Sequence, residues 1–132
     1  GVRDGTIDII ATDHAPHAPE EKAKDITQAP SGMLGLETAF ALANRVLVKE
    51  NGMPFIEMVD KFTVAPAKMY HLPYGDVSVG KIADIVLVDP DEKWVVEGFA
   101  SKSSNSPFIG EEMTGRIRYT VCEGKIAYSL VK

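Results

Sequence analysis

The sequence predicts an α/β fold, and three observations support this prediction. Residues 7–11 form a short apolar run rich in β-branched side chains, which is typical of a strand buried on both faces of a parallel sheet. Apolar residues then recur at helical spacing over residues 36–62, and from residue 75 they alternate at the period of a strand. This order predicts the closing part of a β/α barrel (last strand and C-terminal helices, residues 1–73) and a small β-rich C-terminal domain (residues 74–132).

Composition places the chain among ordinary soluble globular proteins. Its 132 residues are enough for a substantial core. A net charge of −5 argues against nucleic acid as a partner, and no stretch approaches the roughly 20 apolar residues that span a bilayer. The single cysteine, Cys122, excludes an internal disulfide and favours the cytoplasm. Because a buried-type strand begins so close to Gly1, we expect the chain to be the C-terminal piece of a longer protein.

A cluster of ionisable side chains follows the first predicted strand. Asp13, His14 and His17 come directly after it, and Pro16 ends the strand because proline cannot donate to a sheet ladder. The carboxyl ends of strands in α/β enzymes carry catalytic and metal-binding groups. One carboxylate and two imidazoles at such a position form the most chemically reactive group of side chains in the sequence. Asp13, His14 and His17 are therefore the candidates for catalysis or metal binding.

The middle of the chain is predicted to be helical. Residues 18–31 form a predicted loop with a helical turn at residues 20–24, and such a loop beside a candidate site is often functional. The first long helix ends at about Lys49, with a predicted buried face of Leu36, Phe40, Ala43 and Leu47. A second helix, residues 54–62, buries Phe55, Met58, Val59 and Phe62, and a third covers residues 66–72.

The last part of the chain is predicted to form strands. Turn signals lie at residues 79–81 and 89–91, and Glu123-Gly124 is a hairpin signal between residues 116–121 and 125–130. Three side chains invite a chemical interpretation, and for each we favour a structural one. His71 is a solitary histidine that suits packing or the surface. Asp84 is an acid placed before a strand, and Cys122 suits a small position in a strand.

Three separated stretches resemble the dihydroorotases of the amidohydrolase superfamily. They are IATDHAPH at residues 10–17, PSGMLGLETAF at residues 30–40, and GKIADIVLVD at residues 80–89 together with NSPF at residues 105–108. The resemblance implies a metal-dependent (β/α)8 barrel in which Asp13 binds the metal and moves the proton. It implies that His17 holds the carboxylate of the substrate and that Ser31 and Gly32 help to hold the substrate through their backbone. His14 fits the motif but has no direct chemical role.

The resemblance further implies a zinc-dependent enzyme of pyrimidine biosynthesis that interconverts dihydroorotate and carbamoyl aspartate, with one or two zinc ions. A catalytic zinc ordinarily has three protein ligands. The chain offers only Asp13, so we do not expect it to be active alone. The alternatives are a hydantoinase or allantoinase, and an inactive dihydroorotase-like partner of aspartate transcarbamoylase. His17 favours dihydroorotase because it suits an anionic substrate. A homodimer and an assembly with aspartate transcarbamoylase are the further partners that we consider.

Overall fold

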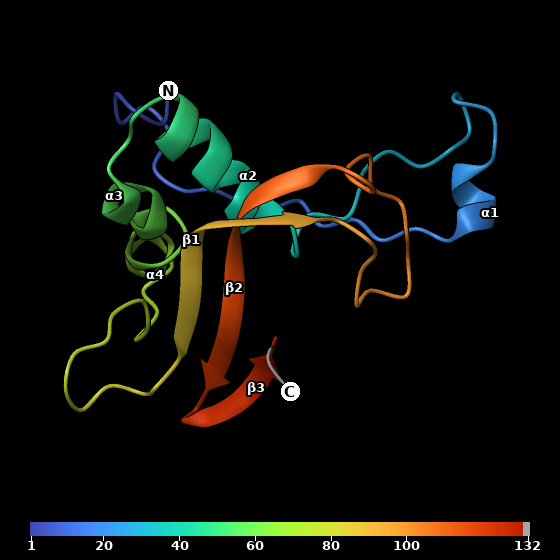
Figure 1. The fold of residues 1–132 in the computed structure, drawn as a ribbon. Coiled ribbons are helices and arrows are strands. Elements are labelled where there is room, and N and C mark those ends of the chain that lie inside the picture. Colours follow the sequence, from blue (N-terminus) through green and yellow to red (C-terminus); the bar gives the residue numbers. More distant parts are fainter. Residues whose placement is uncertain (131–132) are drawn as a thin grey trace.

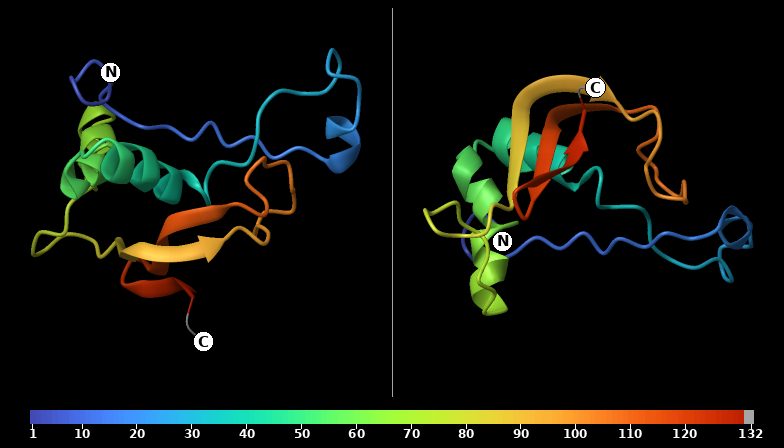
Figure 2. Two further views of the ribbon diagram at one scale, coloured as in Figure 1. Left: turned by 45° about the horizontal axis from the view of Figure 1, so that its top comes forward. Right: turned by 90° about the horizontal axis from the view of Figure 1, so that it is seen from below.

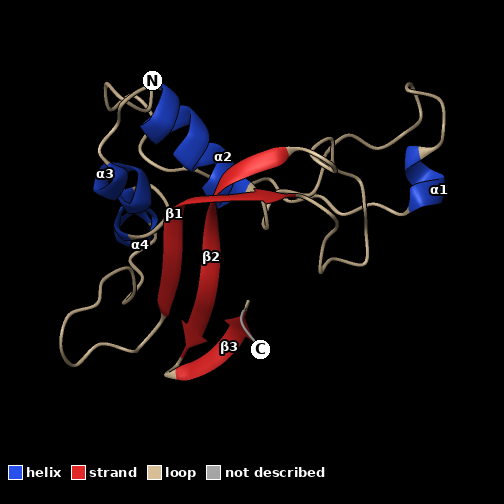
Figure 3. Cartoon of the chain, viewed as in Figure 1, coloured by secondary structure: helices blue, strands red, loops and turns tan. Residues whose placement is uncertain are grey.

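The computed structural model describes residues 1–130 and places a group of helices beside an antiparallel sheet (Figure 1). The sheet has the order β1-β2-β3, with β1 at Ile85–Val95, β2 at Glu112–Cys122 and β3 at Lys125–Ser129. The helices, which Figure 3 distinguishes from the strands by colour, all precede the sheet in the chain. They are α1 (Pro19–Lys22), α2 (Ala39–Ala43), its π-helical continuation η1 (Asn44–Glu50), α3 (Phe55–Asp60) and α4 (Val64–Met69). None of the helices within residues 1–130 has the length and apolar character needed to cross a membrane.

The predicted strand at residues 7–11 is wrong. This segment pairs with no strand of the described chain, and the Ile7 side chain is 46% exposed. Its backbone instead contacts the end of α3, where the Ile10 amide donates to the carbonyl oxygen of Lys61 at 3.1 Å. The segment crosses the molecule from the helices toward α1 (Figure 2). An apolar run becomes a strand only where neighbouring strands lie beside it, and the sheet of this chain lies elsewhere.

Helices α2 and η1 confirm the helix that was predicted to end near Lys49. Ala43 is buried together with Met53, and Phe40 and Leu47 pack against this cluster. Leu36, however, is wrong as a member of the buried face, because it is 62% exposed. It precedes the first residue of α2, so helical spacing does not yet set the direction of its side chain.

Helix α3 confirms the predicted apolar side of the second helix. Met58 is fully buried, and the residues that pack around its cluster include Phe55, Val59 and Phe62. Helix α4 begins slightly before the predicted third helix and ends at Met69. His71 lies exposed after the end of α4, as the surface interpretation predicts. Val2 and Ile10 pack against the same cluster as α3, and this contact holds the N-terminal segment.

The sheet confirms the hairpin at Glu123-Gly124, which joins β2 to β3. Asp84 has the predicted structural role, because its Oδ1 accepts the backbone N–H of Glu123 at 2.7 Å. Cys122 is the last residue of β2 and is exposed. The turn at residues 79–81 is also present, since the Lys81 amide donates to the carbonyl oxygen of Ser78 at 3.1 Å.

The predicted turn at residues 89–91 is wrong, because these residues lie inside the single strand β1. The pairing of β1 with β2 shifts in register between Asp89 and Lys93, and β1 bends there as a bulged strand does (Figure 1). Asp89 Oδ1 accepts the N–H groups of Asp91 and Glu92 at 3.0 and 3.1 Å, as in an isolated turn. The strand continues because β2 pairs with it on both sides of this bend.

Asn44 links η1 to the sheet through hydrogen bonds of its side chain, which is fully buried. Its Nδ2 donates to the carbonyl oxygens of Pro90 and Thr114 at 2.9 and 3.0 Å. We expect Asn44→Ala to lower the free energy of unfolding by about 1–3 kcal/mol, because both carbonyls lose their donor in a poorly hydrated place. Thermal unfolding of the chain measures this loss. The exposed Asn51, whose Nδ2 donates only to Val46, is the control, and an equal loss in Asn51→Ala would contradict the prediction.

Candidate active site

Three segments meet at the end of the molecule that carries α1. They are the Asp13 loop (residues 12–17), the Gly32 segment (residues 30–35) and the Asn105 loop (residues 101–106). His14 and Met33 form an isolated parallel bridge, in which the Ala15 amide donates to the carbonyl oxygen of Met33 at 2.9 Å. The Leu34 amide donates to the carbonyl oxygen of Asn105 at 3.0 Å. Backbone hydrogen bonds therefore join all three segments.

Asp13 has an unusual backbone conformation, and its side chain has no hydrogen-bond partner among residues 1–130. Its φ of 47° lies in the left-handed region, which few residues other than glycine adopt. Its carboxylate is exposed, and within residues 1–130 it makes no hydrogen bond or ion pair. A strained backbone of this kind is characteristic of functional sites, where the surrounding structure holds it in place. The carboxylate is thus presented to solvent, as a metal ligand or a proton acceptor requires.

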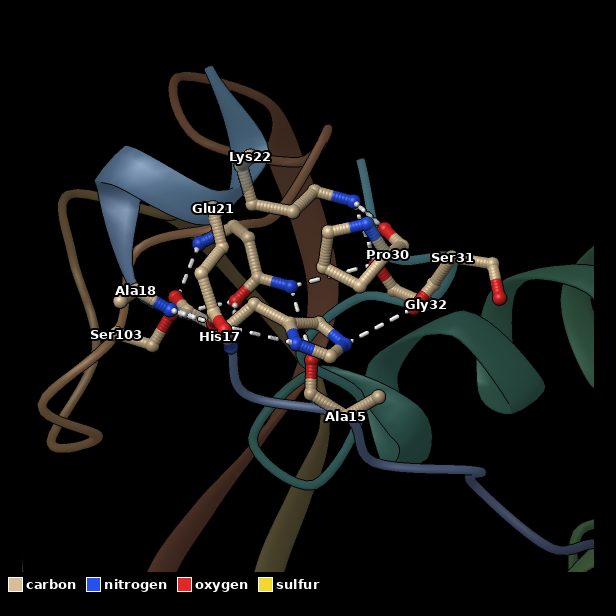
Figure 4. A network of polar contacts seen from close by, with 10 residues as sticks. Ala15, His17, Ala18, Glu21, Lys22, Pro30, Ser31, Gly32 and Ser103 are labelled. Atoms are coloured by element: carbon tan, nitrogen blue, oxygen red, sulfur yellow. Dashed lines mark hydrogen bonds and ion pairs between the residues drawn. The ribbon is translucent and has the colours of Figure 1, made fainter. Parts of the chain in front are cut away.

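The half-buried imidazole of His17 lies between the Gly32 segment and α1 (Figure 4). Its Nε2 is 2.9 Å from the carbonyl oxygen of Ser31, and because a carbonyl can only accept, Nε2 carries a proton. Its Nδ1 is 3.8 Å from Oε2 of Glu21. One side of the ring is therefore fixed by backbone, while the other side faces a carboxylate.

Ser31 and Gly32 lie beside His17 and contribute backbone groups. A Cβ atom built at Gly32 would lie 3.7 Å from Nε2 of His17, so the two residues are close neighbours. Lys22 of α1 holds this backbone from the other side, since its Nζ donates to the carbonyl oxygens of Pro30 and Gly32 at 2.9 and 3.1 Å. Three of the four predicted site residues thus come together, and Asp13 lies in the same loop as His17 without contacting the other two.

The predicted loop at residues 18–31 is built from short local motifs. Its helical turn is α1, where Oε2 of Glu21 accepts the Ala18 amide at 3.2 Å. Farther along, the Thr27 hydroxyl donates to Asp25 at 2.6 Å and the Thr27 amide donates to the same oxygen at 2.9 Å. These two donors lower the pKa of the exposed Asp25 carboxyl below its usual value. The loop therefore has its own hydrogen bonds beside the site.

Asn105 is a site residue that the sequence alone does not reveal. Its Oδ1 accepts the His17 amide at 3.1 Å, and its Nδ2 donates to the carbonyl oxygens of Ala15 and Gly32 at 2.9 and 3.3 Å. The only signal in the sequence is the NSPF stretch, which resembles the dihydroorotase segment but carries no ionisable group. Contacts across 88 residues of chain cannot be inferred from local spacing.

The described residues do not form a complete metal centre. Within residues 1–130 no three His, Cys, Asp or Glu side chains gather closely enough to hold a metal ion. Nδ1 of His14 is already occupied, because it accepts the amides of Gly35 and Leu36 at 3.1 and 3.4 Å. Asp13 offers a single carboxylate, whereas a catalytic zinc ordinarily has three protein ligands. These residues can therefore supply one ligand of a zinc site, and they do not complete it.

A cavity of about 660 Å³ lies between α2 and the sheet, and its lining includes His14 of the Asp13 loop and Ser101 of the Asn105 loop. Side chains in its wall contact one another. Nε1 of Trp94 donates to the carbonyl oxygen of Gly115 at 2.9 Å, and the Arg116 guanidinium lies 5.1 Å from the Trp94 ring centre. Arg116 also pairs with Glu92 at 3.2 Å. The four predicted site residues do not line this cavity: Asp13, His17, Ser31 and Gly32.

Comparison with known proteins identifies relatives of the whole chain. The model of the amidohydrolase family matches residues 1–127. The dihydroorotase of Clostridioides difficile (strain 630) is 48% identical over 129 residues, which are 98% of this chain and 31% of that enzyme. The dihydroorotase of Clostridium acetobutylicum is 51% identical over 129 residues, which are 96% of this chain and 30% of that enzyme.

Solved structures of hydantoinases share the fold. The L-hydantoinase (dihydropyrimidinase) of Arthrobacter aurescens matches 99% of this chain and 31% of its own with a TM-score of 0.88 and 28% identity. The D-hydantoinase of a Thermus species matches 97% of this chain and 30% of its own with a TM-score of 0.86 and 27% identity. The chain therefore spans about three tenths of the length of these relatives. It belongs to the amidohydrolase family.

Proposed function

We propose that this chain is the C-terminal part of a dihydroorotase, which reversibly hydrolyses the cyclic amide of dihydroorotate to N-carbamoyl-aspartate in pyrimidine biosynthesis. Relatives named dihydroorotase support the proposal at 42–51% identity, whereas the matching hydantoinase structures are 21–28% identical. The chain spans only part of those enzymes, and we do not expect it to turn over substrate alone. In the longer enzyme, residues 7–11 would gain the neighbouring strands that they lack here and become the last strand of a barrel. Residues 1–73 would then be that strand and the C-terminal helices of the barrel, and residues 74–132 a small β domain.

The contacts of the His17 imidazole are the observation that supports this proposal. Its ring lies beside the exposed backbone of Ser31 and Gly32, and its Nδ1 already faces the carboxylate of Glu21 at 3.8 Å. An imidazole in this position can bind a carboxylate, which dihydroorotate has and hydantoin lacks. The backbone of Ser31 and Gly32 would hold the ring of the substrate next to this carboxylate.

Asp13 is proposed as the catalytic residue. Its exposed carboxylate would accept a proton during attack on the amide and give it to the leaving nitrogen. It would also contribute one ligand to zinc, and the remaining ligands would come from outside this chain.

The proposed setting of the enzyme is the cytoplasm. A homodimer and a complex with aspartate transcarbamoylase are the proposed assemblies. Several apolar side chains of the N-terminal segment and β1 are exposed and support contact with further protein: Ile7, Ile85, Val86 and Leu87. Sedimentation of the longer enzyme, with and without the transcarbamoylase, distinguishes the two assemblies.

A chimeric enzyme tests the proposed function. In it, this chain replaces the 129 matched residues of the Clostridioides difficile dihydroorotase. The control carries the matching segment of the Arthrobacter hydantoinase in the same scaffold. We expect the first chimera to hydrolyse dihydroorotate and the control to be deficient, whereas the 132-residue chain alone is inactive. Equal turnover of dihydroorotate by both chimeras would contradict the proposal, because the segment would then not determine the substrate.

His17→Ala should raise KM for dihydroorotate more than it lowers kcat. A side chain that binds the substrate carboxylate stabilises ground state and transition state alike, so its loss appears in KM. We expect roughly a tenfold rise, equivalent to about 1.4 kcal/mol. Hydantoin, which has no carboxylate, is the matched substrate and should be affected little. Equal losses for both substrates would indicate a structural role for His17 and would favour the hydantoinase alternative.

A further inference from the structure

We propose that Asn105 is a positioning residue that sets the spacing between the two substrate-binding segments, the Asp13 loop and the Gly32 segment. This inference rests on the proposed function of His17 and Gly32. Asn105 itself belongs to a third segment and would not touch the substrate. Its role would be to determine where the imidazole of His17 lies relative to the backbone of Gly32.

The Asn105 amide bonds to both segments at once. Its Nδ2 donates to the carbonyl oxygen of Ala15 at 2.9 Å and to that of Gly32 at 3.3 Å. Its Oδ1 accepts the His17 amide at 3.1 Å. In addition, its backbone carbonyl accepts the Leu34 amide at 3.0 Å. A single residue thus fixes two positions of the Asp13 loop and two of the Gly32 segment.

The chemistry of these partners requires an amide. Carbonyl oxygens need a donor and the His17 amide needs an acceptor, so the two ends of the side chain cannot be exchanged. The Ser103 hydroxyl lies beside the same groups, since its Oγ is 2.5 Å from both Oδ1 of Asn105 and the carbonyl oxygen of His17. Aspartate has the same shape but would place a charged oxygen against the carbonyls of Ala15 and Gly32.

Asn44 is a matched control for Asn105. It is also an asparagine whose Nδ2 donates to two carbonyl oxygens, those of Pro90 and Thr114. These partners lie in the sheet rather than in the candidate site. Substitution of either asparagine should therefore reduce stability, but only Asn105 should alter the kinetic constants.

The test compares Asn105→Ala, Asn105→Asp and Asn44→Ala in the chimeric enzyme. We expect both Asn105 variants to reduce kcat/KM for dihydroorotate by about 10²-fold, chiefly through KM, as a misplacement of about 1 Å does. Asn105→Asp should be at least as deficient as Asn105→Ala, although it preserves the size of the side chain. Asn44→Ala should lower Tm and leave KM within about twofold. Unchanged KM in both Asn105 variants, with a Tm loss like that of Asn44→Ala, would overturn the inference.

A second readout separates this inference from the proposed function. If the unsubstituted chimera fails to hydrolyse dihydroorotate, the proposed function falls, and amide hydrogen exchange in the 132-residue chain decides the role of Asn105. Asn105→Ala should accelerate exchange at the amides of Ala15, His17 and Leu34 by about tenfold or more, the factor for each 1.4 kcal/mol of lost protection. The amides of β2 should keep their rates. Unchanged exchange at those three amides would show that Asn105 does not hold the segments.

Discussion

Asp13→Ala is expected to abolish turnover of dihydroorotate by the chimeric enzyme and to leave its fold intact. The carboxylate is exposed and makes no hydrogen bond within residues 1–130, so its removal should change stability little. A general base contributes about 10²–10⁴-fold to the rate, and loss of a metal ligand adds to the deficiency. Steady-state kinetics measures kcat, and circular dichroism of the same preparation verifies the fold.

Two further variants show whether the effect belongs to the carboxylate of Asp13. Asp13→Asn retains a residue type that tolerates a φ of 47°, so it removes the charge without disturbing the backbone. It should be as inactive as the alanine variant. Asp8→Ala removes an exposed aspartate from the preceding segment and should leave kcat unchanged. Retention of more than about a tenth of kcat by Asp13→Asn, against the 10²–10⁴-fold expected of a base, would refute this assignment.

Gly32→Ala is expected to have the second largest effect, on both stability and activity. Gly32 has a φ of +103°, and a Cβ atom there would lie 2.6 Å from Cβ of Ala15 in the Asp13 loop. The two segments must then separate, or the backbone must leave its conformation, which itself contributes strain of about 1–3 kcal/mol. A displacement of about 1 Å in a binding site can reduce the rate by 10²-fold, and we expect a loss of kcat/KM of this size.

Gly80→Ala is the matched control for this prediction. Gly80 also has a positive φ, +91°, but nothing lies within 4 Å of its Cβ position. Its substitution introduces a comparable backbone strain without a collision, so Tm should fall while kcat/KM stays constant. If Gly32→Ala lost no more activity than Gly80→Ala, close approach of the two segments would be unimportant for the site.

Local signals explain what could be predicted from the sequence. The hairpin at Glu123-Gly124 was predictable because two residues determine the turn and the flanking alternation determines the strands. The apolar side of α3 follows likewise from the spacing of Phe55, Met58 and Val59. In the candidate site, Asp13, His14 and His17 could be selected because all three are ionisable and follow an apolar run, and only the resemblance to dihydroorotases separated His17 from His14.

The errors arise where distant residues decide the structure. Residues 89–91 have the hydrogen bonds of a turn, but pairing with β2 makes them a bend within β1. Residues 7–11 have the composition of a buried strand, but no neighbouring strand lies beside them in residues 1–130. Asn105 is neutral and lies 88 residues from its partner His17, so neither charge nor spacing indicates its contacts.

The position of Asn105 in the chain has a consequence for biosynthesis. Ribosomes add about 5–20 residues per second, so the 88 residues between His17 and Asn105 correspond to roughly 4–18 s of translation. During that interval the nascent Asp13 loop lacks the side chain that holds it against the Gly32 segment. The candidate site therefore matures late, and a ribosome that stalls before residue 105 leaves the loop open to proteases and chaperones.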